Sequence, residues 1–114
     1  MTKGKAADVR LATYGSLAPG RVNHHQLAAL EGRWLRGVVR GRLVEAGWGA
    51  SLGHPGLVLD LEGPVVEVHV FESAVLPQHW ERLDAFEGDG YRRVVARVVT
   101  DEGEMDAWIY ALAT

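Results

Sequence analysis

The sequence contains no cysteine, no apolar run near the ~20 residues of a membrane span, and no excess of basic charge. Without cysteine the chain has no disulfides, no thiolate catalysis and no thiolate metal site. Fifteen acidic and twelve basic residues give a net charge of −3, so the chain as a whole is not drawn to phosphate backbones. We therefore expect no membrane partner, no nucleic-acid partner and a cytoplasmic location.

The composition that remains is that of an ordinary globular domain. The 114 residues are 47% hydrophobic and 24% charged, and a chain of this length buries roughly 65% of its unfolded surface in one core. Residues 1–8 carry lysines but lead into no apolar run of the kind found in a signal peptide. We interpret residues 1–8 as a flexible N-terminal tail and residues 9–114 as a single domain.

Alternating apolar and polar residues predict six strands, and two segments have helical spacing. The expected strands cover residues 9–14, 34–45, 57–62, 65–71, 91–100 and 105–112, and the expected helices cover 24–30 and 76–86. Gly63-Pro64 is a turn signal that would join the third and fourth strands as a hairpin. Asn23 is a fair N-cap for the first helix, and Gly88 can end the second.

Two glycines suggest how these strands are arranged. Gly37 and Gly41 fall on the apolar face of the strand at 34–45, where glycine favours the bend that a sheet needs to curl into a barrel. The prediction is an α+β fold with a mixed, largely antiparallel, barrel-like sheet covered by short helices.

Glu87 is the first candidate for chemistry. It follows Phe86 at the end of the second expected helix and precedes Gly88-Asp89-Gly90, where bare backbone lets a ligand approach closely. A helix C-terminus and burial both disfavour its charge and raise its pKa toward the range of a general base. The alternative is an ordinary carboxylate in water at a helix end.

The second candidate stretch is Tyr14-Gly15-Ser16-Leu17, where the first strand ends. Successive N–H groups at such a turn, with the Ser16 hydroxyl, form a nest for an anion; the alternative is a plain turn. No spacing links any histidine to Ser16 or to a metal, so we expect no catalytic triad, metal or cofactor.

The two stretches together carry a resemblance. Y-G-S-L-x-P-G, then L-D-x-F-E-G-x-x-Y-R-R and a closing W-x-Y, is similar to the gamma-glutamylcyclotransferase-like family, in its bacterial AIG2-like branch, from about Leu11 to Leu112. The resemblance implies a small α+β barrel with a cavity. It also implies that residues 14–17 hold the substrate and that Glu87 is the catalytic acid/base. Leu17, where other members have asparagine, points away from the larger glutathione-type branches.

The function that this resemblance implies is a gamma-glutamyl cyclotransferase, an acyltransferase that converts a small gamma-glutamyl amine or peptide into 5-oxoproline and a free amine. Tyr91 and Tyr110 are expected to line the pocket, or else to be half-buried strand residues. One rival is a non-catalytic module that binds a small metabolite in the same cavity. Another is an amide-cleaving enzyme that releases glutamate. We expect a monomer or a small homo-oligomer.

Overall fold

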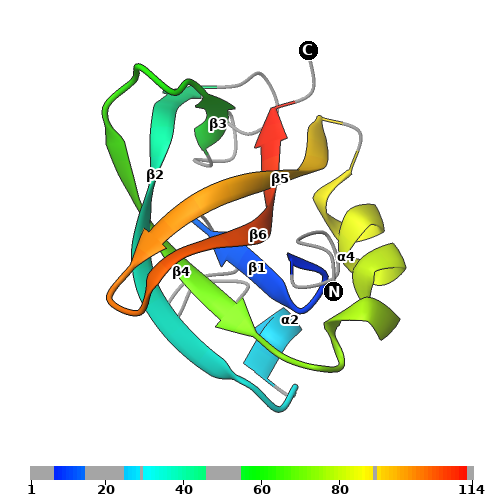
Figure 1. Cartoon of the computed structure of the whole chain (residues 1–114). Coiled ribbons are helices and arrows are strands. Elements are labelled where there is room, and N and C mark those ends of the chain that lie inside the picture. Colours follow the sequence, from blue (N-terminus) through cyan, green and yellow to red (C-terminus); the bar gives the residue numbers. More distant parts are fainter. Residues whose placement is uncertain (1–6, 15–24, 29, 46–54, 89, 113–114) are drawn as a thin grey trace.

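The computed structural model describes residues 7–14, 25–28, 30–45, 55–88 and 90–112. Figure 1 shows the strands with short helices outside them. In chain order the elements are β1 (Arg10–Thr13), α2 (His25–Ala28), β2 (Arg33–Glu45), β3 (Pro55–Leu59), β4 (Val65–Glu72), the 3₁₀ turn η1 (Leu76–Gln78), α4 (Trp80–Glu87), β5 (Tyr91–Thr100) and β6 (Gly103–Leu112).

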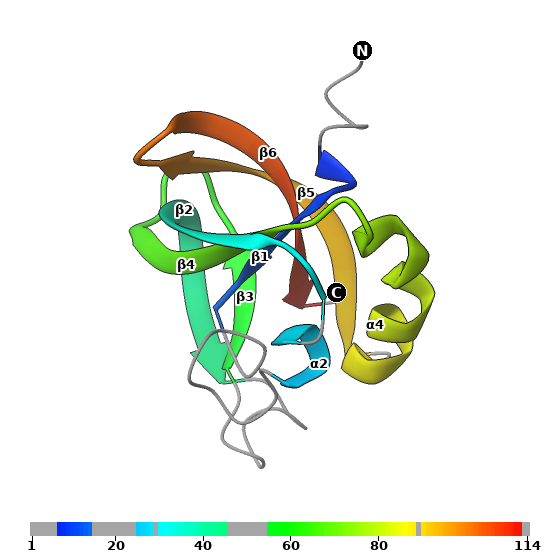
Figure 2. The ribbon, with the colours of Figure 1, turned by 90° about the horizontal axis from the view of Figure 1, so that it is seen from below.

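Five of the strands close into a barrel. The sheet order is β3-β2-β4-β1-β6-β5, and β5 returns to pair with β2, so β3 is an extra strand beside the closed ring. The neighbours β1 and β6 are parallel, and the other pairs are antiparallel. The predicted α+β fold with a mixed, largely antiparallel barrel is confirmed. Helix α4 lies against the outside of the barrel, beside β5 (Figure 1, Figure 2).

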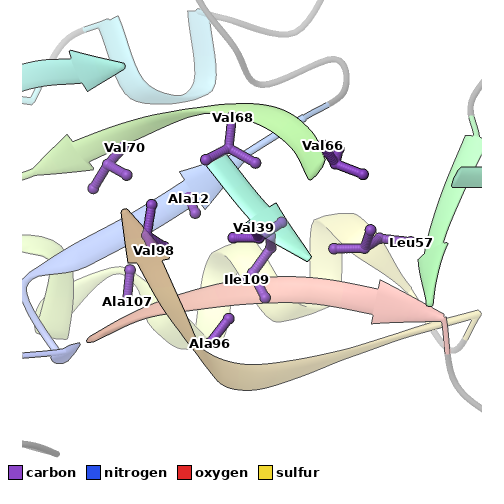
Figure 3. Close-up of a cluster of buried hydrophobic side chains, with 10 residues drawn as sticks. All are labelled: Ala12, Val39, Leu57, Val66, Val68, Val70, Ala96, Val98, Ala107 and Ile109. Carbon is purple, nitrogen blue, oxygen red and sulfur yellow. The ribbon is translucent and has the colours of Figure 1, made fainter. Parts of the chain in front are cut away.

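The five strands of the closed ring each contribute to two cores, because successive side chains point to opposite faces. On β1, Ala12 points into the barrel and Leu11 points outward beneath the helices; on β6, Ile109 and Tyr110 divide in the same way. Figure 3 shows the barrel interior, which is filled by Ala12, Val39, Leu57, Val66, Val68, Val70, Ala96, Val98, Ala107 and Ile109. The outer core comprises Leu11, Leu27, Phe71, Leu76, Trp80, Leu83 and Tyr110.

The prediction that Gly63-Pro64 joins the third and fourth strands as a hairpin is wrong. β3 and β4 both pair with β2 and lie on its opposite edges. The peptide between Arg40 and Gly41 shows this directly: its N–H donates to the Pro64 carbonyl, and its C=O accepts from the Asp60 N–H on the other side. The 13-residue β2 is long enough to hold both neighbours. A turn signal alone could not reveal that a third strand runs between them.

The ends of the predicted elements shift in three places. The helix expected over 76–86 is divided at His79 into η1 and α4. The helix expected over 24–30 covers His25–Ala28, and its expected cap, Asn23, lies outside the described residues. The tail expected over 1–8 stays a prediction for residues 1–6, which also lie outside them, whereas Ala7 is buried and Asp8 accepts a hydrogen bond from the Trp108 indole.

Gly37 sits at the seam that closes the barrel. It pairs with Thr100 where β2 meets β5. A Cβ built on Gly37 would lie 2.8 Å from Val98 Cγ1 and 2.9 Å from the Val99 carbonyl oxygen. The prediction that an inner-face glycine permits closure therefore holds at this position.

We expect Gly37→Ala to lower the free energy of unfolding by about 1–3 kcal/mol, because the added methyl group overpacks the seam against backbone that cannot move aside. Urea denaturation measures the change. The control is Gly90→Ala, since a Cβ on Gly90 meets no atom within 4 Å. Equal midpoints for the two variants would contradict this account of the seam.

Candidate active site at the end of helix α4

Glu87 is the last residue of α4, and Gly88 ends the helix immediately after it. The Gly88 N–H donates to the Asp84 carbonyl oxygen at 3.1 Å. Gly88 has φ 83° and ψ −176°, a conformation that is almost exclusive to glycine. The glycine that the sequence predicts as the helix stop thus turns the chain directly from Glu87 toward β5.

Burial raises the pKa of the Glu87 carboxyl to about 7. Among the described residues, no cationic side chain forms an ion pair with Glu87. The negative end of the helix dipole disfavours the carboxylate in the same direction. The shift that the sequence led us to expect is therefore present, and its main cause is the loss of water around the carboxyl group.

Three tyrosines lie within reach of the charge of this carboxyl group, and each comes from a different strand region. Tyr14 follows β1, Tyr91 begins β5 and Tyr110 lies in β6. For each of them burial is the largest cause of a raised pKa, and the charge of Glu87 raises it further. The structure thus brings Glu87 together with Tyr14, Tyr91 and Tyr110, all four of which the sequence predicts as site residues.

Two of these tyrosines donate their hydroxyl protons to hydrogen-bond acceptors within the protein. Tyr14 Oη donates to the Tyr110 carbonyl oxygen at 2.5 Å and accepts from the Leu57 N–H at 3.1 Å. Tyr110 Oη donates to Asp84 Oδ1 at 2.7 Å. Tyr14 therefore joins β3 and β6 across one end of the barrel, while Tyr110 joins β6 to α4.

Sequence reasoning missed Asp84 and Arg93. Arg93 Nε and Nη2 donate to the two Asp84 carboxylate oxygens at 2.8 and 3.2 Å. The Arg93 guanidinium carbon also lies 4.4 Å from the Trp80 ring centroid and 4.5 Å from that of Trp108. The available signals were the position of Asp84 inside the L-D-x-F-E-G motif and the outward phase of Arg93 on its strand. Neither signal names the partner.

The turn at Gly15, Ser16 and Leu17 lies outside the described residues, so its expected role as an anion nest stays a prediction. Tyr14, the residue immediately before it, is within reach of the charge of Glu87. A hollow between α4 and strands β5 and β6 adjoins the site, and Tyr91 and Tyr110 are in its lining.

The described residues contain no group of three or more His, Asp or Glu side chains placed to hold a metal ion. The helices within those ranges all lack the length and the apolar sequence that a membrane span requires.

The raised pKa predicts that the ionisation of Glu87 lowers the stability of the fold as the pH rises. In the folded protein the carboxyl binds its proton up to about pH 7, against 4.5 ordinarily. Its contribution to stability is thus fully present below about pH 4.5 and is lost as pH rises through about 7. For each pH we take the unfolding free energy of Glu87→Gln minus that of wild type. We expect this difference to be more positive at pH 8 than at pH 4 by on the order of 2–3 kcal/mol.

Urea denaturation at both pH values measures this effect. Glu81→Gln is the matched control, because Glu81 is an exposed residue of the same helix. Its stability difference from wild type should be nearly the same at both pH values. A Glu87→Gln variant that gains no more than this control would show that Glu87 is hydrated in solution.

The geometry described so far defines a class, the small mixed β-barrel proteins with a shielded carboxyl group held at the rim by an outer helix. The comparisons with known proteins then identify the family. The sequence model of the family "Gamma-glutamyl cyclotransferase, AIG2-like" matches residues 11–114. The chain belongs to this family, and the resemblance noted from its motifs is confirmed.

Solved structures share the fold. YkqA from Bacillus subtilis is 30% identical with a TM-score of 0.71 over 91% of this chain, which spans 35% of YkqA. An AIG2-like protein from Mus musculus is 23% identical with a TM-score of 0.72, over 93% of this chain and 78% of its own. An uncharacterised protein from Pyrococcus horikoshii is 26% identical with a TM-score of 0.66, over 93% and 79%. No curated protein matches the chain.

Proposed function

We propose that this protein is a gamma-glutamyl cyclotransferase-type enzyme that converts a small gamma-glutamyl amine or peptide into 5-oxoproline and the free amine, with Glu87 as the general acid/base. The observation that carries the proposal is the shielded Glu87 carboxyl with a pKa of about 7 at the rim of a barrel of this family. A pKa near the working pH is what a group needs if it is to accept and return a proton in one cycle.

The first half of the reaction forms a bond within the substrate. The alpha-amine attacks the side-chain carbonyl carbon of its own glutamyl residue, and a C–N bond forms as the carbonyl π electrons move onto oxygen. An alpha-amino group titrates near ~8, so it is largely protonated at neutral pH and a base must take its proton. The ionised form of Glu87 is that base. Since the attack is intramolecular, holding the two ends together supplies much of the rate.

The second half breaks the original amide bond. The oxygen lone pair re-forms the carbonyl group, the C–N bond to the leaving amine breaks, and the protonated Glu87 carboxyl gives its proton to that nitrogen. The attacking nitrogen begins with three protons and ends with one in the lactam, while the leaving nitrogen begins with one and ends with three as an ammonium ion. Glu87 relays these two protons in turn and ends ionised, so one carboxyl group serves both steps. The N–H groups of Gly15, Ser16 and Leu17 are the donors that we assign to the developing oxyanion or the substrate carboxylate, on the strength of the family resemblance.

The Glu87→Gln variant should retain the shape of the site and lose the proton transfer. We expect kcat/KM for gamma-glutamyl amines to fall by at least about 100-fold, which is the lower range for a positioned acid/base. Chromatographic detection of 5-oxoproline, over a panel of gamma-glutamyl amines and peptides, measures it. Glu81→Gln should keep wild-type turnover, and unchanged turnover by Glu87→Gln would refute the assignment of the base.

The pH profile is an independent check. Because Glu87 must begin ionised, kcat/KM should rise with pH through an apparent pKa of about 7. A further limb near ~8 would report the substrate amine, whose neutral form is the nucleophile. A profile flat down to pH 5 would be incompatible with a shielded Glu87 as base.

The same panel separates the rival functions. Binding of gamma-glutamyl ligands by wild type without any turnover would favour a non-catalytic module. Free glutamate in place of 5-oxoproline would favour hydrolysis of the amide bond by water.

A further inference from the structure

The phenols near Glu87 raise a question about protons. A tyrosine hydroxyl that donated to Glu87 would stabilise the carboxylate and weaken it as a base. Yet Tyr110 Oη donates to Asp84 and Tyr14 Oη donates to the Tyr110 carbonyl oxygen. Both of these hydroxyl groups therefore direct their protons away from Glu87.

Asp84 is the acceptor that holds the Tyr110 proton. Its Oδ1 accepts from Tyr110 Oη at 2.7 Å and from Arg93 Nε at 2.8 Å. Burial acts to raise the pKa of Asp84, but the hydrogen bonds from Arg93 and Tyr110 outweigh it and hold that pKa below its ordinary value. Asp84 is thus an ionised acceptor at neutral pH, and it stands one helical turn before Glu87.

Arg93 in turn keeps Asp84 in place. Its guanidinium packs against the rings of Trp80, from α4, and Trp108, from β6, which meet edge to face with their centroids 6.5 Å apart. The two indole N–H groups are themselves fixed, because they donate to the Asp8 carbonyl oxygen at 3.0 Å and to Asp8 Oδ1 at 2.8 Å. A planar cation that packs against two aromatic rings and donates two hydrogen bonds to one carboxylate has little freedom to turn.

We propose that the Asp84–Arg93 pair is a positioning element for Glu87, which holds the Tyr110 hydroxyl proton away from the Glu87 carboxylate and fixes the last turn of α4 on β5. Its geometry is independent of the proposed function, and its catalytic consequence rests on that function. Without Asp84, the Tyr110 hydroxyl would be free to turn to the nearest remaining anion.

Glu87 is the next carboxylate on α4, one helical turn after Asp84, so it is the anion that we expect the freed hydroxyl to meet. Its charge reaches Tyr14 beyond β1, Tyr91 in β5 and Tyr110 in β6. Tyr110 is bonded to Asp84 and through it to Arg93, and the exposed Arg92 follows Tyr91 on β5. Of the carboxylates, Asp84 and Glu87 are the two whose charges act on Tyr110.

The test follows the Glu87 side-chain carboxyl by ¹³C NMR during a pH titration, with its signal assigned by comparison with Glu87→Gln. Wild type should titrate near 7. Asp84→Ala removes the acceptor, and we expect the midpoint to fall by about one pH unit or more, as a hydrogen bond to a carboxylate does. Where gamma-glutamyl substrates are turned over, the acid limb of kcat/KM should move by the same amount.

Two further variants separate the hydrogen bond from the charge of Asp84. Asp84→Asn removes the charge but keeps an acceptor at the Oδ1 position, so it should shift the midpoint much less than Asp84→Ala. In a Tyr110→Phe background the hydroxyl is gone, and Asp84→Ala should then lose most of its effect. An Asp84→Ala shift of equal size with and without the Tyr110 hydroxyl would overturn the proposal, and so would no shift at all.

A purely structural role would give a different pattern. Arg97→Met is the matched control, because Arg97 lies on the same face of β5 and pairs with Asp106 at 3.0 Å, away from α4. It should cost some stability and leave the Glu87 midpoint unchanged; a midpoint shift equal to that of Asp84→Ala would count against a specific route. Arg93→Lys removes the forked donor that holds Asp84 in place, so it tests the same pair from its other member. It should shift the Glu87 midpoint in the same direction as Asp84→Ala.

The NMR titration needs no substrate, so the two proposals fail separately. If wild type turns over substrate but Asp84→Ala leaves the Glu87 midpoint unchanged, the positioning role is refuted and the enzymatic function stands. If the midpoint moves as expected but no substrate is turned over, the enzymatic function is refuted and the positioning role stands.

Discussion

The docking of α4 on the barrel depends on one partly buried cation, the guanidinium of Arg93. Arg93 projects from β5, forms a forked ion pair with Asp84 of α4, and packs against an indole from α4 and an indole from β6. A guanidinium suits this position because it is planar and always charged, and because its stem can lie along apolar surface. Three elements are thereby held in one arrangement, and the end of α4 carries Glu87 with it.

The barrel gives that arrangement a rigid base. Its strands present small and branched side chains to the interior and larger ones to the outer core, as Ala12 and Leu11 do on β1. Helix α4 contributes Trp80 and Leu83 to the outer core, and η1 contributes Leu76, so both segments bury their apolar side chains against the strands. Because both cores share the same strands, a shift of α4 would disturb the packing of the ring beneath it.

The position of Glu87 reconciles two opposing demands. A carboxyl group that is shielded enough to have a pKa near 7 must lose its water and still lack a compensating donor or cation. Among the described residues, the nearby Arg93 is paired with Asp84, and the Tyr14 and Tyr110 protons go to other acceptors. Arg93, Tyr14 and Tyr110 thus each have a partner other than Glu87, so none of them offsets the loss of water around its carboxyl group.

The sequence by itself determined the strand count, the mixed barrel, the stop at Gly88 and the candidacy of Glu87, because alternation, helical spacing and glycine placement are local signals. It did not determine that β3 and β4 flank β2, since local patterns do not name a strand's neighbours. The Asp84–Arg93–Tyr110 network was also decided only by the tertiary structure. Arg93 and Tyr110 face each other across the β5–β6 hairpin, and Asp84 joins them only because α4 docks beside that hairpin, which no local pattern specifies.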